Sequence, residues 1–307
     1  MDDVLEKVPV ELLEHLESII FDGGMLSAGL CQQVCAELSI DLEALMIKLL
    51  PLAASFSNPV ISKYQVGAVA KGAIKENGFA NLYLGANFEF AGQALCFSIH
   101  AEQSALSNAW CHDEPYLESI AVTAPPCGHC RQFLYEMSGD RDFLVVLPSD
   151  TNGKTVSTID LSQLLPSAFG PLDLGCERLL MEPSFGSNKF SFLSKITDEL
   201  VANALHAARF CYAPYTSNFA GCAIELNNGK IYIGRYAENA AHNPSLSPFA
   251  SAYSNAMISR KPSEKIKINR VVLVENSTLA SQKGVCQSQL LGCGSDVKLE
   301  YISASSN

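Results

Sequence analysis

Three side chains in the first half of the chain are of the types that bind zinc. His100 is followed by Cys127 and Cys130, two cysteines separated by two residues. Zinc prefers imidazole and thiolate ligands; a structural site usually has four protein ligands, whereas a catalytic site has three and keeps the fourth position open. We therefore predict a catalytic zinc centre, with one Zn²⁺ per chain, held by His100, Cys127 and Cys130.

An acidic residue lies close to this predicted centre. Glu102 follows His100 by two residues, and Pro126 precedes Cys127. Zinc lowers the pKa of a bound water from about 15.7 towards about 7, and a neighbouring carboxylate can take that proton and return it to a leaving amine. The pattern H-x-E followed by P-C-x-x-C is the signature of zinc deaminases. The sequence therefore predicts hydrolytic deamination, with Glu102 transferring the proton.

The Cys-x-x-Cys pair has two other interpretations when it is taken by itself. It could be a redox pair or half of a structural zinc site with four ligands. His100 and Glu102 favour the catalytic zinc. His129, which lies inside the pair, is expected beside the metal or at the surface. The chain has eleven cysteines; we expect the other nine to be small apolar core residues, and we expect no disulfide framework.

The rest of the sequence indicates the elements that would position these residues. Apolar residues recur at helical spacing within the first 50 residues, and Pro51 is expected to end the last of these helices. Short β-like runs then alternate with helices that begin near His100 and Gly128. The expected strands cover residues 66–70, 82–85, 119–123 and 143–147. This order predicts an α/β layered fold with a mixed sheet.

A weak internal repeat indicates that the α/β unit is duplicated. Gly67–Val69 has a counterpart in Cys222–Ile224, and each begins eight residues after a proline. Between the two copies lies a stretch rich in Pro, Gly and Ser, which is typical of a connecting segment. We expect an N-terminal helical arm (1–50), a catalytic zinc deaminase domain (51–150), a connecting arm (151–188) and a degenerate, non-catalytic deaminase-like domain (189–307).

The second copy lacks the metal-binding and acidic residues that catalysis would require. Aligned at equal distances from an upstream glutamate, Phe249 stands opposite His100, and Ser251 stands opposite Glu102. The nearby thiols are seven residues apart and cannot reproduce the Cys-x-x-Cys pair. We therefore expect the second copy to be retained for packing.

Composition and charge exclude several other classes of protein. Hydrophobic residues make up 48% of the chain and charged residues 17%, as in folded globular proteins. The net charge is 21 − 32 = −11, so the chain has no general positive field that would attract nucleic acid. The first residues are acidic and lack a secretory signal, and no apolar run is long enough to span a bilayer. We expect a cytoplasmic protein with no nucleic-acid or membrane partner.

Together these motifs resemble the cytidine deaminase family, in its homodimeric type with two deaminase-like domains per chain, known in bacteria and plants. The resemblance covers most of the chain and is carried by His100–Ala105, Pro126–Phe133, Gly85–Phe90, Ala168–Pro171 and Tyr236–Ala241. It implies a zinc enzyme of pyrimidine salvage that converts cytidine and 2′-deoxycytidine, with water, to uridine and 2′-deoxyuridine plus ammonia. It also implies a duplicated three-layer deaminase fold with a mixed sheet, and a homodimer.

The same resemblance implies residues that bind the ribose. Asn87 and Glu89 would hold the 3′-hydroxyl. From residue type alone, a turn amide and an exposed acid are the simpler interpretations of this pair.

Further residues are implied for the pyrimidine base. Tyr64, where the family often carries Phe, would pack on the base, although a core aromatic is the simpler interpretation of its type. The backbone N–H of Ala101 and the carbonyl of Pro125 would contact the base carbonyl and the departing amine. The arm around Phe169 and the segment Ala240–Ala241 would approach the active site of the partner subunit.

Two rival functions share parts of this pattern. A nucleic-acid editing deaminase would use the same chemistry, but it needs a basic channel and stacking aromatics. The net charge of −11 and the single tryptophan, Trp110, argue against it. A zinc-stabilised binding protein without activity would have no use for Glu102 beside an open metal position.

Overall fold

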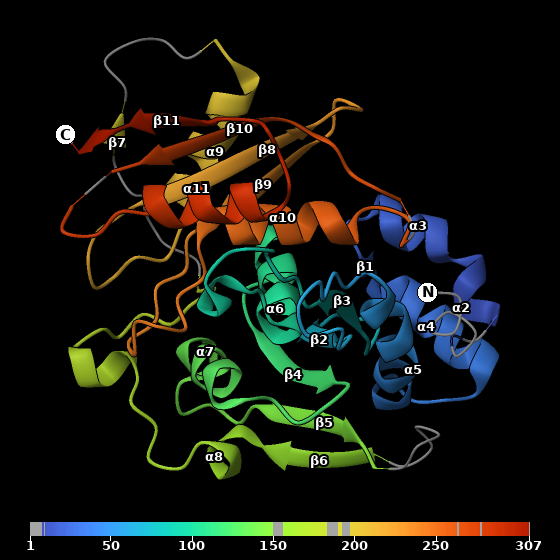
Figure 1. Cartoon of the computed structure of the whole chain (residues 1–307). Coiled ribbons are helices and arrows are strands. Elements are labelled where there is room, and N and C mark those ends of the chain that lie inside the picture. Colours follow the sequence, from blue (N-terminus) through green and yellow to red (C-terminus); the bar gives the residue numbers. More distant parts are fainter. Residues whose placement is uncertain are drawn as a thin grey trace.

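The computed structural model is built around two main sheets, each with helices packed against it (Figure 1). It describes Val8 and residues 10–149, 156–182, 190–191, 197–262, 264–276 and 278–306. Within these residues, none of the helices has the length and the apolar composition that crossing a membrane requires.

Helices fill the N-terminal part of the chain, as the apolar spacing predicted. The helices are α2 (Val10–Glu14), α3 (Leu16–Phe21), α4 (Ala28–Leu38) and α5 (Leu42–Ser55). The Asp41 side chain caps α5 by accepting a hydrogen bond from the Ala44 N–H at 2.8 Å. The prediction that Pro51 ends this helix was wrong, because α5 continues through it to Ser55. Ten of the fourteen residues of α5 are buried, and this packing outweighs the helical hydrogen bond that proline cannot donate.

The first sheet is mixed, as expected, and has the strand order β1-β3-β2-β4-β5-β6. Strand β2 is antiparallel to β3 and β4, β4 is parallel to β5, and β5 is antiparallel to β6. The strands are β1 (Met25–Leu26), β2 (Gly67–Ile74), β3 (Ala80–Ala86), β4 (Leu117–Val122), β5 (Leu144–Pro148) and β6 (Val156–Asp160). The sheet thus takes edge strands from the N-terminal arm and from the segment after residue 150.

Helices pack on both faces of this sheet and make it the middle of three layers. Helix α5 packs on one face, and α6 (Ala101–Cys111) packs on the other. Helix α7 (Gly128–Ser138) lies beside α6 (Figure 1). The shorter elements are η1 (Leu95–Phe97), α8 (Leu161–Leu164) and η2 (Pro171–Leu174).

The second half of the chain repeats this arrangement. Its four-stranded sheet has the order β11-β10-β8-β9, with β8 antiparallel to its two neighbours and β10 parallel to β11. The elements are α9 (Glu199–Arg209), β8 (Ala220–Leu226), β9 (Ile231–Arg235), α10 (Pro248–Ile258), β10 (Ile268–Glu275), α11 (Lys283–Gly292) and β11 (Leu299–Ser303). A separate short pair joins β7 (Phe190–Ser191) to β12 (Ser305–Ser306). The predicted duplication is therefore visible in the order and direction of the strands.

Glycines at close contacts correct the register of the repeat. A Cβ on Gly67 would lie 2.5 Å from the Leu50 carbonyl of α5, and a Cβ on Gly221 would lie 2.5 Å from the Ala204 carbonyl of α9. Gly67 therefore corresponds to Gly221, one residue before the Cys222 with which the sequence echo had aligned it.

A second pair of glycines corrects the alignment of the catalytic helix. A Cβ on Gly85 would lie 2.4 Å from the Ala101 carbonyl, and a Cβ on Gly234 would lie 2.1 Å from the Pro248 carbonyl. Since Ala101 and Pro248 are the first residues of α6 and α10, Ser247 is the counterpart of His100.

The predicted matches at this helix were therefore two residues out of register. Phe249 corresponds to Glu102 and not to His100, and Ser251 corresponds to Ser104. The loop before the helix is two residues shorter in the second copy, and in the first copy it contains η1. Residues at equal distances from Glu89 and Glu238 along the chain therefore do not occupy equivalent positions in the two copies.

The two halves meet where α6 packs against α10. The hydroxyls of Ser104 and Ser254 are 2.7 Å apart, and those of Ser107 and Ser251 are also 2.7 Å apart. In the corrected register Ser104 is equivalent to Ser251, and Ser107 is equivalent to Ser254. The two hydrogen bonds are therefore equivalent, and a local two-fold axis between α6 and α10 relates one to the other.

A buried carboxylate forms a second link between the halves. Glu136 of α7 is fully buried. It accepts hydrogen bonds from the Tyr212 hydroxyl at 2.9 Å, the Tyr215 hydroxyl at 2.5 Å and the Ala240 N–H at 2.9 Å. Burial raises the pKa of Glu136. All three donors belong to the second half, so that half holds the helix on which the thiol ligands lie.

We predict that Gly85→Ala destabilises the protein by about 1–3 kcal/mol, because the added methyl would push α6 away from β3. Thermal unfolding should show a lower Tm, and the zinc content should fall as His100 moves. Gly284→Ala in α11 is the matched control, because a Cβ there meets no atom within 4 Å. Equal Tm values for the two variants would contradict the prediction.

Candidate metal centre and active site

The three predicted ligands lie together in the structure. The Sγ atom of Cys127 is 3.6 Å from His100 Nδ1 and 3.7 Å from Cys130 Sγ. Zn–S bonds are about 2.3 Å long and Zn–N bonds about 2.0–2.1 Å. Around a tetrahedral zinc, a sulfur and a nitrogen ligand therefore lie about 3.6 Å apart, and two sulfur ligands lie about 3.8 Å apart. In the part of the chain that the structure describes, this is the one such group of His, Cys, Asp and Glu side chains. Donor types and spacing therefore fit zinc.

The ligands are held at the starts of two neighbouring helices. His100 is the residue before α6, and Cys127 is the residue before α7. Each ligand therefore lies at a helix N-terminus, where the partial positive charge of the helix stabilises a thiolate. The contact of α6 with β3 at Gly85 sets the height of His100 above the sheet.

Sequence reasoning assigned no role to Gln103, which fixes the start of α6. Its Oε1 accepts a hydrogen bond from the His100 N–H at 3.3 Å, and its Nε2 donates to the Pro244 carbonyl of the second half at 3.0 Å. Glutamine at the third position of a helix is a known capping signal. That signal is normally sought after Ser or Thr, and the residue before this helix is histidine.

One of the two sulfur atoms is electrostatically prepared for a cation. The hydrogen bond with Cys130, followed by that with His100, lowers the pKa of Cys127 to about 3. The same interaction with Cys127 raises the pKa of Cys130, and the hydrogen bond with Cys127 raises the pKa of His100. The group thus already carries a thiolate near neutral pH, as a zinc ligand must.

Glu102 lies beside these ligands and is buried, with 4% of its surface exposed. Burial raises the pKa of its carboxyl group. A raised pKa makes the Glu102 carboxylate a stronger base, which suits it to take up a proton in general acid–base catalysis.

A pocket of about 250 Å³ opens over the metal ligands. Glu102 lines it together with His100 and Cys127. Of the residues predicted to bind substrate, five line the same pocket: Tyr64, Asn87, Glu89, Ala101 and Pro125. The fold therefore brings these residues together from four separate segments of the sequence.

The two residues assigned to the ribose are both tied to the loop that carries Tyr64. Asn87 accepts a hydrogen bond from the Val66 N–H at 2.8 Å and donates to the Tyr64 carbonyl at 2.9 Å. Glu89 Oε2 accepts from the N–H groups of Ile61 and Ser62, at 2.6 and 2.8 Å.

The charge of Glu89 is stabilised by these contacts. Burial alone would raise the pKa of its carboxyl group, but hydrogen bonds from Ser62 and Ile61 outweigh it, so the pKa is lowered. Both backbone N–H groups donate to Oε2 of Glu89, and the residue lines the pocket.

Phe169 lies outside this pocket. Its carbonyl accepts a hydrogen bond from Gln132 Nε2 of α7 at 2.6 Å, and 47% of its surface is exposed. Tyr64 is also mostly exposed, at 57%. It is therefore not the core aromatic that its residue type alone would suggest.

The positions of His129 and of the nine other cysteines agree only in part with the prediction. The ring of His129 stacks on that of His100, with centroids 5.0 Å apart, so it lies beside the metal ligands as expected. All eleven cysteines are free. The expectation that the other nine lie in the core was wrong for four: Cys96 is exposed, and Cys111, Cys176 and Cys293 are half-buried.

Comparison with known proteins adds the family. A family model described as the cytidine and deoxycytidylate deaminase zinc-binding region matches residues 39–146, and a second model with the same description matches residues 161–286. A cytidine deaminase of Aliivibrio fischeri is 38% identical over 99% of this chain and 97% of its own length. One of Photorhabdus laumondii is 43% identical over 90% of this chain and 88% of its own length. A solved cytidine deaminase from Burkholderia pseudomallei is 25% identical, with a TM-score of 0.34, over 41% of this chain and 97% of that chain.

The chain therefore belongs to the cytidine deaminase family, in its two-domain bacterial type. Both halves match the zinc-binding region, but the corrected register puts Ser247 at the position of His100. Helix α11 starts after Gln282 and α7 starts after Cys127, so Gln282 and Val285 stand at the positions of the two ligand cysteines.

We predict that the zinc-free protein keeps the Cys127 thiolate down to low pH. Because its pKa is about 3, the thiolate should persist at about pH 5, where an ordinary thiol with a pKa of about 8.5 is protonated. Ultraviolet thiolate absorbance should fall at that pH in Cys127→Ala. It should not change in Cys31→Ala, since burial raises the pKa of Cys31 to about 12. Equal absorbance in Cys127→Ala and the parent protein would contradict the assignment.

Proposed function

We propose that this protein is a zinc-dependent cytidine deaminase that converts cytidine and 2′-deoxycytidine to uridine and 2′-deoxyuridine plus ammonia. One observation carries the proposal. A buried carboxylate, Glu102, and two of the zinc-type ligands, His100 and Cys127, line the same pocket as Asn87 and Glu89. Such a pocket accommodates a nucleoside with its base at the ligands and its sugar at the amide and carboxylate.

The assignment of residues to zinc is part of the proposal. His100, Cys127 and Cys130 would hold the ion through one imidazole nitrogen and two thiolates. When bound, zinc supplies a Lewis acid that makes water a nucleophile near neutral pH.

Glu102 would move the protons of the reaction. The oxygen of water forms a bond to C4 of the pyrimidine, and the bond from C4 to the amino nitrogen breaks. Glu102 takes a proton from the attacking water and delivers it to N3. It then carries the second proton to the amino nitrogen, which leaves as ammonia, so that C4 ends as a carbonyl.

The other pocket residues would orient the substrate. The Ala101 N–H and the Pro125 carbonyl would contact the base carbonyl and the leaving amine, and Tyr64 would pack on the ring. Asn87 would donate to the 3′-hydroxyl and Glu89 would accept from it. The place of both residues in the pocket lining and the lowered pKa of Glu89 support this assignment.

The biological setting follows from the same chemistry. We infer a role in pyrimidine salvage in the cytoplasm, with the free nucleoside as the partner rather than nucleic acid or membrane. The net charge of −11 supports this choice, since a strand-binding channel is basic.

We further infer a homodimer in which Phe169 and the segment Ala240–Ala241 reach the active site of the partner subunit. Phe169 is exposed, and its carbonyl accepts a hydrogen bond from Gln132 of α7, which supports this inference. We retain residues 51–150 as the catalytic domain and 189–307 as the degenerate domain, with 1–50 and 151–188 as the arms.

We predict that Glu102→Gln keeps zinc and loses about 10²–10⁴-fold in kcat, because the amide cannot take up a proton. Metal analysis and the ultraviolet rate of cytidine loss, measured on one sample, check both statements. Glu76→Gln, at an exposed position in the same domain, is the control and should keep full activity. Loss of zinc in Glu102→Gln would contradict this prediction, because it would show that Glu102 supports the metal site.

We predict that Glu89→Gln lowers kcat/KM for cytidine about tenfold to hundredfold. This is the effect expected when a hydrogen bond to a charged group is lost. Its amide oxygen can still accept from the N–H groups of Ile61 and Ser62, so the loop should stay folded. Activity on 3′-deoxycytidine should change little, since that substrate lacks the hydroxyl. Equal losses on both substrates would remove Glu89 from the ribose site.

A further inference from the structure

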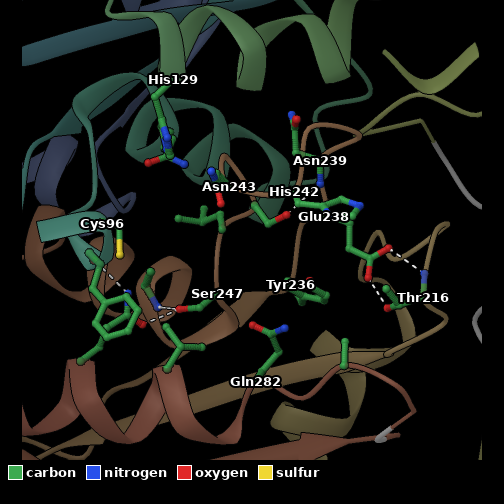
Figure 2. Close-up of a pocket in the computed structure, with 18 of the residues that line it drawn as sticks. Cys96, His129, Thr216, Tyr236, Glu238, Asn239, His242, Asn243, Ser247 and Gln282 are labelled. Atoms are coloured by element: carbon green, nitrogen blue, oxygen red, sulfur yellow. Dashed lines mark hydrogen bonds between the residues drawn. The ribbon is translucent and has the colours of Figure 1, made fainter. Parts of the chain in front are cut away.

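A second cavity, of about 660 Å³, lies between the two halves of the chain. We call it the second cavity. Its volume is in the range of sites that bind small molecules. Residues of both halves line it, among them Phe97, Gln103 and His129 from the first half. Figure 2 labels ten of its lining residues, which come from several segments and point towards a common space.

This cavity contains the counterpart of the catalytic pocket. In the first half, Phe88 forms isolated β-bridges to Asn58 and Ile99; in the second half, Ala237 forms the same bridges to Tyr212 and Leu246. These bridges align the segments around Asn58, Phe88 and Ile99 with their counterparts, and the starts of α7 and α11 align Cys127 with Gln282. Eight residues of the second cavity then stand at positions that line the catalytic pocket: Thr216, Tyr236, Glu238, Ser245, Leu246, Ser247, Ala280 and Gln282.

The proposed sugar-binding acid is kept in this second copy. Glu238 stands at the position of Glu89, and its Oε2 accepts hydrogen bonds from the N–H groups of Tyr215 and Thr216, at 2.8 and 3.2 Å. Glu89 receives the same two bonds from its own loop. The carboxylate of Glu238 is thus held by the backbone in the way that its catalytic counterpart is held.

Glu238 can still accept a hydrogen bond from a ligand. Its Oε1 accepts from the Thr216 hydroxyl (Figure 2). A carboxylate oxygen has two lone pairs, so one position remains on Oε1. Tyr236, which replaces Asn87, adds a phenol to the same wall of the cavity.

The groups that would convert a bound nucleoside are absent from this copy. Ser247, Gln282 and Val285 replace the three zinc ligands, and Phe249 replaces Glu102. Hydroxyl, amide and aliphatic side chains are not the ligands that zinc selects, and phenylalanine cannot transfer a proton. The second cavity therefore keeps the counterpart of Glu89 and lacks counterparts of the zinc ligands and of Glu102.

We propose that the second cavity binds a nucleoside through its ribose hydroxyls and releases it unchanged. This inference rests on the proposed function, because it takes the ligand class from the role of Glu89. The ligand is a neutral, sugar-bearing molecule: Glu238 would repel a phosphate placed next to the sugar, and the hydroxyls of ribose are donors that suit a carboxylate.

The experiment is equilibrium dialysis with uridine, which the deaminase reaction does not consume. Wild-type protein should bind two uridines per chain. Glu238→Gln should weaken the second cavity's affinity at least tenfold and leave one uridine per chain. Glu89→Gln should also leave one, and the double variant should leave none. A wild-type protein that binds one uridine, together with a Glu89→Gln variant that binds none, would overturn the proposal.

The same series separates failure of this proposal from failure of the proposed function. If Glu89→Gln keeps the wild-type stoichiometry while Glu238→Gln loses one uridine, the second cavity is supported and the role of Glu89 is refuted.

A second variant protects the test against misfolding of Glu238→Gln. Ala280 lines the cavity on the loop before α11 and is half-buried, so Ala280→Trp should fill the cavity without touching the backbone bonds of Glu238. It should bind one uridine at a Tm close to that of wild type. A properly folded Ala280→Trp protein that binds two uridines would also contradict the proposal.

Discussion

The close contact between α6 and β3 at Gly85 is the constraint on which the active site depends. A methyl group there would lie 2.2 Å from the Ala105 nitrogen, so helix and strand touch through their backbones. This contact sets where α6 starts, and His100 and Glu102 stand at that start. Helix α7 must then bring its two thiols to the same point, and Glu136 anchors that helix to the second half. The geometry of three ligands therefore depends on packing that extends well beyond them.

Much of the fold and of the candidate site could be predicted from local patterns. The strands around Val69 and Ile120 are short apolar runs, and the metal ligands follow a pattern in which residue type and spacing both carry information. Asn87 and Glu89 were reached only through the resemblance to a family, because an amide and an acid near a turn are common for other reasons. Their place in one pocket with Glu102 depends on strand pairing that no local pattern contains.

The errors have physical causes of the same kind. Pro51 did not end α5, because tertiary burial outweighed a local propensity. The repeat was found, but it was aligned wrongly at Phe249. The loop before α10 is two residues shorter than the loop before α6, so the fold is the same but the number of residues before the helix differs. Gln103 was overlooked because its capping role involves a histidine, and Glu136 because an acid in a helix usually faces solvent. Long-range hydrogen bonds to the second half give both residues their roles.

The paired serines between α6 and α10 have a consequence for the behaviour of the chain at low concentration. Two separate subunits joined by such a contact would come apart on dilution. Here both sides of the contact belong to one polypeptide, so it forms within the molecule, at an effective concentration set by the connecting chain. The helix that carries Glu102 therefore keeps its partner helix however dilute the protein becomes.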